Sequence, residues 1–455
     1  MMKRRFTRLS FLISLIIFMG YSTAAFGWST HPMLVYPILK TMPELAGAKD
    51  VEVKSLHRFL MEEEQGLVHL LRSQELWARE HIKNYVARPE VLDFSATGNP
   101  DDILQRFLHA LRINPNVKLA LYLHLLPGEK PGDRDTISPH LLTPLSQIYE
   151  MLHATYVRIE EGELVSPIYV MATATDEPDY GFDLGLFEDN GTSWGQKYGF
   201  GEQSFGNPAL EYGSQAPFHM GFYHESWLVF AAAPFLKRTY VEYRIHLYKT
   251  LSEYAFSKGQ DYWGWRFLGW ATHYLNDLSM PYHTSVLPAK GPLAMIWINI
   301  KAMLGFPRSR DNAVLLLSNR HTVYEFFQWL ILREAHLSGN NNHPFLKALV
   351  NPIDRIAYDN DFPRKVAAHE SARMARQQDR TLQRHTPDYL VSDPAYIITS
   401  SSELEGLIEW IRDAKGEEAI DGLTEMVAER FSALSMHTRS FVRAVLENAA
   451  LSDER

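Results

Sequence analysis

Cysteine is missing from the whole chain of 455 residues. Disulfide bonds are therefore excluded, and any metal site must use histidine, aspartate, glutamate or a chain terminus. The sequence also lacks an excess of positive charge, because 45 Lys and Arg residues face 54 Asp and Glu residues, for a formal net charge of −9. An acidic surface disfavours strong non-specific binding to nucleic acid, although bound metal ions can supply positive charge locally. After residue 27, the sequence contains no run long and apolar enough for a transmembrane helix.

The first 27 residues have the pattern of a secretory signal peptide. A basic start precedes a short apolar run at 11–19, and Ala25-Phe26-Gly27 is a small-x-small cleavage signal. The basic residues are Lys3, Arg4, Arg5 and Arg8. We therefore expect residues 1–27 to be removed, which would leave Trp28 as the N-terminus and a net charge of −13. This predicts a secreted or periplasmic protein.

The mature chain 28–455 has the apolar spacing of helices over most of its length, and its 46% hydrophobic content allows a sizeable core. Among other segments, we expect helices over 117–126 and 141–159. Helical spacing disappears at 161–220, where glycine and aromatic residues crowd together. A loop this long in a compact domain is usually functional or disordered, and the aromatic content argues against disorder. The sequence predicts a single all-α domain with a loop-rich insertion.

The segment 273–283 carries the clearest chemical signal. His273 and Asp277 are four residues apart, so they share one face of a helix. Pro281 must bend or end that helix, which leaves His283 free to turn back toward the same place. His321 and Glu325 form a second pair with the same spacing. Imidazole and carboxylate ligands suit zinc, so this pattern predicts a metal site.

The pattern His-x-x-x-Asp-x-x-x-Pro-x-His at 273–283, followed by His-x-x-Tyr-Glu-Phe at 321–326, resembles the zinc-dependent phospholipase C family, whose relatives include single-strand-specific nucleases. This resemblance implies an exported all-helical fold that binds three zinc ions. In the family, the mature chain begins with a tryptophan whose amine and carbonyl bind one zinc, and a histidine ligand follows. Trp28 and His31 match that arrangement. The resemblance covers the N-terminus and about 172–330, and residues 40–165 and 340–455 match only as generic helices.

The resemblance also implies how the ligands are shared among the three ions. Asp176, His219, His273 and Asp277 would bind the first; His283, His321 and Glu325 the second; and Trp28, His31 and the bridging Asp277 the third. Asp176 would also act as the catalytic general base.

Two of these ligand assignments have competitors. Asp179 competes with Asp176, and His224 competes with His219. Pro178 disfavours helical backbone at the preceding Glu177, so we expect the two Asp side chains to point to different places. Asp176 and His219 lie 43 residues apart, so the stretch 181–217 between them has the character of an insertion into the family pattern. A second insertion, 285–318, separates His283 from His321.

The family resemblance implies a zinc-dependent phosphoric diester hydrolase, and we expect a phospholipase C acting on phospholipid. A single-strand-specific nuclease and a non-catalytic zinc-stabilised protein are the alternatives. Glu325 favours the lipase, because the nucleases more often have Asp at the matching place. The apolar stretch 291–307 is bounded by glycine and proline and has Lys301 near its end. It is either an element that dips into a lipid surface or a buried helix of the core.

Overall fold

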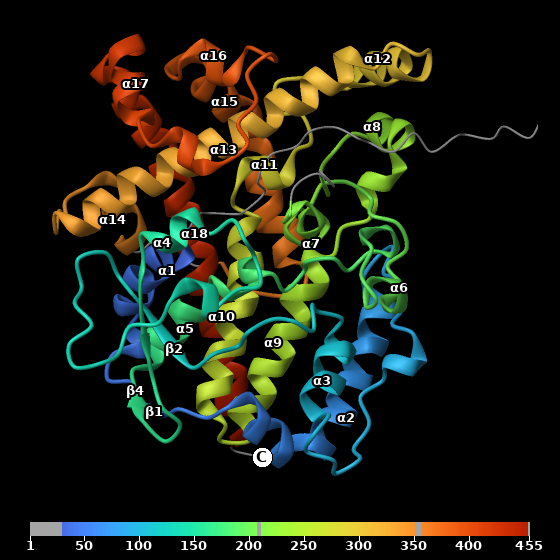
Figure 1. Ribbon diagram of the computed structural model, residues 1–455, viewed down its shortest axis with the longest axis vertical. Helices are drawn as coiled ribbons and strands as arrows, with labels where there is room; N and C mark the ends of the chain where they lie inside the picture. Colours follow the sequence, from blue (N-terminus) through green and yellow to red (C-terminus); the bar gives the residue numbers. More distant parts are fainter. Residues whose placement is uncertain (1–29, 207–210, 352–355, 454–455) are drawn as a thin grey trace, which may run out of the picture.

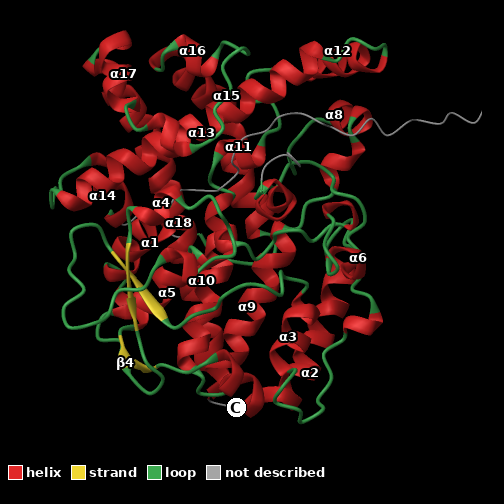
Figure 2. Ribbon diagram, in the orientation of Figure 1, coloured by secondary structure: helices red, strands yellow, loops and turns green. Residues whose placement is uncertain are grey.

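The computed structural model describes residues 30–206, 211–351 and 356–453. Helices make up 62% of the chain and strands 3%, which confirms the predicted all-α fold class (Figure 2). The longer helices are α1 (His31–Lys40), α2 (Leu56–His81), α3 (Ile103–Leu111), α5 (Pro167–Ala174), α9 (Val241–Ser257), α10 (Asp261–Asp277), α12 (Pro292–Met303), α13 (Arg308–Leu337), α15 (Ala368–His385), α17 (Leu407–Lys415) and α18 (Glu417–Asp453). The shorter helices are α4 (Tyr149–Leu152), α6 (Gly195–Tyr198), α7 (Ala216–His219), α8 (Trp227–Ala232), α11 (Pro281–Thr284), α14 (Pro344–Val350) and α16 (Asp388–Val391).

Helices α9 and α10 form an antiparallel pair at the centre of the molecule (Figure 1). Gly259 makes the turn between them with φ 66°, a backbone conformation that favours glycine. Every residue of α10 after Asp261 is buried, as expected for a helix surrounded by others. Gly269 allows α5 to approach closely, because a Cβ there would lie 2.6 Å from the carbonyl oxygen of Met171. Helix α10 is therefore a fixed support for the residues at its C-terminal end.

Two large hydrophobic clusters surround this centre. The first joins α2, α3, α5, α9 and α10 and contains the fully buried Trp263 and Trp270. The second joins α1, α13, α14, α17 and α18. The long helix α18 packs against α9, α10, α14 and α15, so it links the two clusters. Helix α13 crosses the upper part of the molecule in Figure 1, and α12 and α8 lie near one another at the upper right.

Two predicted helices are wrong, because the chain forms short strands at those places. Strand β2 (Tyr122–Leu125) lies within 117–126, and β3 (Thr155–Arg158) lies within 141–159. They pair antiparallel, with Tyr122 opposite Arg158. A second small pair joins β1 (Val51–Glu52) to β4 (Leu164–Val165). Within 141–159 only α4 is an α-helix, so tertiary pairing overrides the local helical spacing.

The glycine- and aromatic-rich region is not structureless. It contains α5, and beyond Asp176 it is built from short helical turns packed around aromatic side chains. Phe218 lies 5.1 Å from Phe200 and 4.9 Å from Tyr240, measured between ring centroids. The other insertion, 285–318, forms α12 and the start of α13. The alternative of a buried helix at 291–307 is wrong, because Leu293 and Trp297 on α12 are 76% and 56% exposed.

Candidate metal centre

Three groups of buried side chains each bring three potential ligand atoms within 4.8 Å of one another. They are His31, Asp179 and His273; His219, His273 and Asp277; and His283, His321 and Glu325. His273 belongs to two of the groups, so two of them are adjoining. Clusters of imidazole and carboxylate groups in the interior are unusual unless a metal ion or an ion pair compensates them.

The end of α10 delivers the central ligands as the sequence predicts. His273 and Asp277 lie one turn apart on the buried helix, and α10 ends at Asp277. Met280 then takes an extended conformation, with φ −82° and ψ 123°, and Pro281 begins the short helix α11. This reversal places His283 with Nδ1 3.9 Å from Oδ2 of Asp277. Local helix geometry and one proline therefore explain how three ligands from eleven residues meet.

The carboxylate of Asp277 is the common point of the centre. Its Oδ2 lies 2.8 Å from Nδ1 of His219 and 3.4 Å from Nε2 of His273. Its Oδ1 lies 3.4 Å from Nε2 of His31. Burial alone would raise the pKa of Asp277, but the surrounding histidines hold it well below its usual value. A carboxylate that faces imidazoles with both oxygens has the geometry of a bridging ligand.

Backbone carbonyls fix the orientation of two of the imidazoles. Nδ1 of His273 donates to the carbonyl of Thr175 at 2.7 Å, and Nδ1 of His283 donates to the carbonyl of His219 at 3.0 Å. A carbonyl only accepts, so in the neutral ring the proton is on Nδ1 and the lone pair is on Nε2. Metal-binding histidines commonly have such an outer partner. Nε2 of His273 lies 3.1 Å from Nδ1 of His219, which brings two ring nitrogens of the centre together.

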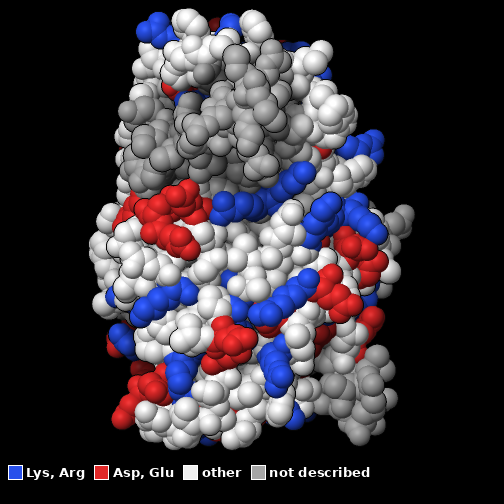
Figure 3. Space-filling model, turned by 90° about the vertical axis from the view of Figure 1, so that its right-hand side faces the viewer, with Lys and Arg blue, Asp and Glu red and all other residues white. Residues whose placement is uncertain are grey.

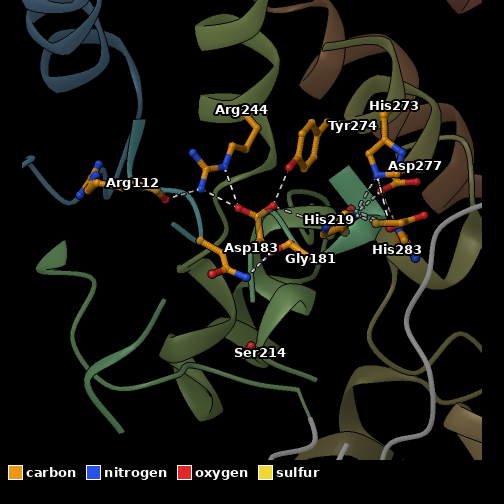
Figure 4. A network of polar contacts seen from close by, with 12 residues as sticks. Arg112, Gly181, Asp183, Ser214, His219, Arg244, His273, Tyr274, Asp277 and His283 are labelled. Carbon is orange, nitrogen blue, oxygen red and sulfur yellow. Dashed lines mark hydrogen bonds and ion pairs between the residues drawn. The ribbon is translucent and has the colours of Figure 1, made fainter. Parts of the chain in front are cut away.

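The ring nitrogen of His219 that faces away from Asp277 lies beside a buried carboxylate, Asp183, which was not predicted from the sequence. Nε2 of His219 lies 3.5 Å from Oδ2 of Asp183 (Figure 4). Arg244 donates to Oδ1 of Asp183 at 2.6 and 2.9 Å, and the hydroxyl of Tyr274 donates to Oδ2 at 2.6 Å. Burial opposes ionisation of Asp183, but the Arg244 guanidinium lowers its pKa below the ordinary value. Asp183 therefore remains charged and holds the His219 ring with Nδ1 toward Asp277.

The second pair also lies where the sequence places it. Nε2 of His321 lies 2.8 Å from Oε1 of Glu325, and the two rings of His283 and His321 have centroids 5.0 Å apart. Burial raises the pKa of Glu325 well above its ordinary value and lowers the pKa of His321 well below. In the protein alone, both groups are thus driven toward their neutral forms. A divalent cation would reverse this for Glu325 by compensating its charge.

Several ligand atoms of the centre make no hydrogen bond with any residue that the structure describes. They are Nδ1 and Nε2 of His31, Oδ1 of Asp179, Oδ1 of Asp277, Nε2 of His321 and Oε1 of Glu325. Buried polar atoms are normally paired, because desolvation without a partner costs roughly 1–3 kcal/mol each. Imidazole nitrogens and carboxylate oxygens are common ligands of metal ions in proteins. The residues present therefore fit metal ions.

Asp179, rather than Asp176, reaches the first two groups. Oδ1 of Asp179 lies 3.6 Å from Nε2 of His273 and 3.7 Å from Nδ1 of His219. The geometry does not support the expectation that Asp176 takes this place. Asp176 instead accepts a hydrogen bond from the backbone N–H of His31 at 2.7 Å and another from the hydroxyl of Tyr180 at 3.2 Å.

The backbone explains why the two aspartates diverge. A 3₁₀ helix spans Glu177–Tyr180, so Glu177 is helical despite the following proline, contrary to the expected extended conformation. Asp176 precedes that helix and lies beside α1 through its bond to His31, and Asp179 lies within it. Burial raises the pKa of Asp179 well above its ordinary value, against the lowering effect of His219. Asp179 is therefore a group whose charge a nearby cation would stabilise.

The competitor His224 lies outside the centre. It is exposed, and its Nε2 donates to the carbonyl of Arg364 at 2.8 Å. Trp28, the other predicted ligand, lies outside the residues that the structure describes. His124 on β2, which was not among the predicted residues, also lies beside the centre, with Nδ1 3.4 Å from Oδ2 of Asp176. Its only sequence signal was a lone histidine in a segment expected to be helical.

Residues after 340 support the centre rather than serving only as filler. On α18, the hydroxyl of Thr438 donates to Oδ1 of Asn276, the neighbour of Asp277, at 2.9 Å. On α15, Asp379 accepts a hydrogen bond of 2.8 Å from the hydroxyl of Tyr282, the neighbour of His283. These contacts fix the backbone on both sides of the turn at Pro281.

A pocket on one side of the centre offers access to it. Asp176 and Asp179 line this pocket together with Thr30, Ile148, Tyr156 and Tyr180. The fold and the centre together define an all-α protein with a buried cluster of histidine and carboxylate groups suited to metal ions. Comparison with known protein families, curated proteins and solved structures finds no match for this chain.

Proposed function

We propose that the protein is a zinc-dependent phosphodiesterase, and specifically a phospholipase C that hydrolyses phospholipid. The strongest support is the arrangement of the three groups of candidate ligands. The group with His31 and the group with His219 share His273, and the group with His283 lies beside them. Asp277 lies within 3.9 Å of a nitrogen of His31, His219, His273 and His283. Its carboxylate is therefore suited to bridge neighbouring ions.

In this proposal three sets of residues would hold the ions, and two of the sets share Asp277. His219, His273, Asp277 and Asp179 would bind the first ion, and His283, His321 and Glu325 the second. His31 and Asp277 would bind the third, with Trp28 completing it if the signal peptide is removed. Bound zinc ions would acidify a water molecule and neutralise charge on a phosphodiester.

The protein's own residues would orient the reaction. Asp179 is the proposed proton acceptor, because Oδ1 lies beside both His219 and His273, and the pocket that it lines gives a substrate access. Asp176 would position His31 through the backbone N–H. Asp183 would keep the proton of His219 on Nε2, away from the ions. In this proposal Asp179, rather than Asp176, is the general base.

Two surface features favour lipid over single-stranded nucleic acid as substrate. Helix α12 exposes Leu293 and Trp297, and Trp227 on α8 is 75% exposed. On the face seen in Figure 3, positive and negative side chains are interspersed rather than gathered in one basic stripe. Within the part of the chain that the structure describes, no helix is long and apolar enough to cross a bilayer. Contact through 291–307 would therefore be peripheral, at the surface of a membrane that a secreted or periplasmic protein meets.

Parallel assays would test this function. The mature protein, loaded with zinc, is given phosphatidylcholine dispersed in detergent, single-stranded DNA, and a soluble chromogenic phosphodiester. We expect release of phosphocholine, inhibition by a chelator, and recovery on adding zinc. Hydrolysis of the DNA alone would make the protein a nuclease, and no hydrolysis of any of the three would leave a non-catalytic metal protein. Asp277→Asn is the inactive control.

A further inference from the structure

A second pocket, separate from the one lined by Asp176 and Asp179, adjoins the group formed by His283, His321 and Glu325. It lies among α8, α12, α13 and the residues around Met220, and His321 is part of its lining. Most of the other lining side chains are apolar, among them Phe222, Val229 and Met295. Its volume is about 110 Å³, the same order as apolar cavities of about 150 Å³ that stay dry and bind benzene. The pocket therefore suits a segment of hydrocarbon rather than water.

Helix α12 is apolar on two faces, and only one of them faces the pocket. Met295, Ile296 and Asn299 line the pocket. Leu293, Trp297 and Ile300 follow one another at spacings of four and three residues, and they are 76%, 56% and 39% exposed. A helix that only packed against the core would not need the second apolar face. This arrangement suits an element that lies between a buried pocket and a lipid surface.

Lysine side chains lie beside two aromatic side chains of this surface, the exposed Trp297 and the half-buried Phe230. Nζ of Lys301 lies 5.5 Å from the ring centroid of Trp297, and Nζ of Lys237 lies 5.0 Å from that of Phe230. Long cationic side chains beside aromatic rings are typical of surfaces that meet the phosphate layer of a membrane. The local positive charge contrasts with the net charge of −9 of the whole chain.

We infer that this pocket binds one acyl chain of the phospholipid substrate while its phosphate lies at the metal centre. The identity of the ligand rests on the proposed function. The position of the acyl chain rests on the pocket itself, because His321 of the metal centre is part of its lining. A peptide is a poorer occupant, because its backbone N–H and C=O groups would need partners that a mostly apolar lining does not supply. Residues 216–236 and 286–321, rather than the metal ligands alone, would then select the substrate.

Adjacent alanines on α8 provide a matched test. Ala231 and Ala232 are both exposed, and only Ala232 lines the pocket. Ala232→Trp should therefore obstruct the pocket, and Ala231→Trp should not. Ala313→Trp on α13 fills the pocket from another side, and it keeps the test decisive if Ala232→Trp disturbs α8. Circular dichroism checks the fold of each variant.

The first measurement is binding, which does not require activity. The zinc-loaded protein is titrated with a polyene fatty acid whose fluorescence rises in apolar surroundings. We expect saturable binding with one site per chain, weakened at least tenfold in Ala232→Trp and Ala313→Trp and unchanged in Ala231→Trp. Failure of the wild type to bind, or equal loss in Ala231→Trp, would overturn the inference. If the protein bound no fatty acid and instead formed a dimer at higher protein concentration, the α12 face would be an interface with a second copy. That result would also overturn the inference.

The second measurement separates the pocket from the reaction. Monomeric phosphatidylcholines of increasing acyl length are compared with p-nitrophenyl phosphocholine, which has no acyl chain. For the wild type, kcat/KM should rise by up to about fourfold per added methylene, the factor expected for burying one CH₂ group. The two pocket variants should flatten that rise and leave the chainless ester within about twofold. Hydrolysis without chain-length dependence contradicts the pocket but not the enzyme; variant-sensitive fatty-acid binding without any hydrolysis supports the pocket and contradicts the enzyme.

Discussion

Oε1 of Glu325 lies 2.8 Å from Nε2 of His321, one turn earlier on α13, yet neither atom makes a hydrogen bond with a described residue. The two side chains are buried. Burial raises the pKa of Glu325 and lowers the pKa of His321, so it favours the uncharged form of each side chain. The two side chains, both on α13, are therefore suited to bind a cation together.

Replacing Glu325 should remove one ion and leave the others. Glu325→Gln keeps the shape but loses the anionic ligand, so we expect the zinc content to fall by about one ion per chain and turnover to fall by at least about 10²-fold. Elemental analysis and the soluble phosphodiester assay measure both. Glu334→Gln, an exposed position on the same helix, is the control and should match the wild type. Unchanged zinc content in Glu325→Gln would exclude this group as a metal site.

The intact protein should contain close to three zinc ions per chain. Three groups of ligand atoms come together, and binding energy at such sites contributes to folding because the unfolded chain does not hold the ligands in place. Chelation should therefore abolish activity and lower the melting temperature, and re-addition of zinc should restore both. Elemental analysis that finds one ion or none would contradict the three-ion arrangement.

Asp179 and Asp176 should differ in their effects on turnover. Asp179→Asn removes the oxygen that faces His219 and His273, so we expect turnover to fall by roughly 10²–10⁴-fold, the usual contribution of general-base catalysis. Asp176→Asn keeps an oxygen that can accept from His31, and its effect should be under about tenfold. Comparison of kcat and zinc content in the two variants decides between them. The reverse order would restore Asp176 as the base.

Asp183 should matter for stability more than a surface carboxylate does. Its ion pair with Arg244 is fully buried, so Asp183→Asn leaves the guanidinium uncompensated and should lower the free energy of unfolding by about 3–5 kcal/mol. Asp361→Asn is the matched control, because Asp361 pairs with Lys365 at side-chain exposures of 57% and 68%. That change should stay within about 0.5 kcal/mol. Urea unfolding of the two variants at one zinc concentration measures the difference, and equal effects would contradict it.

His246 should make part of the stability dependent on pH. Burial, with Lys249 and His81, lowers its pKa from 6.5 to about 3, and its ring stacks on Trp77. Between these two pH values the unfolded chain binds a proton that the folded chain does not, so the free energy of unfolding falls as pH decreases through that window. His246→Phe keeps the stacking but cannot titrate. Unfolding midpoints from pH 7 to pH 4 should decline less steeply in the variant, and parallel curves would refute the assignment.

The parts of the centre that could be predicted from sequence are those fixed by local geometry. Four-residue spacing on a helix places His273 with Asp277 and His321 with Glu325, and a proline after the helix turns His283 back. The choice of Asp179 over Asp176 could not be predicted, because it depends on how the 3₁₀ helix at 177–180 meets α1 and α10. Likewise, β2 and β3 exist through pairing with each other, which helical spacing within each segment does not reveal.

The ligands of the centre come from widely separated parts of the chain, between His31 and Glu325. Direct contacts already join residues 58 positions apart within the centre, at His219 with Asp277, and 145 positions apart beside it, at His31 with Asp176. Bound ions would close these long loops, and constraining long loops removes much entropy from the unfolded chain. Because the protein has no cysteine and so no disulfide bonds, the bound ions would be its cross-links. The rate of unfolding would then depend on the concentration of free metal ions and would not change when a thiol reductant is added.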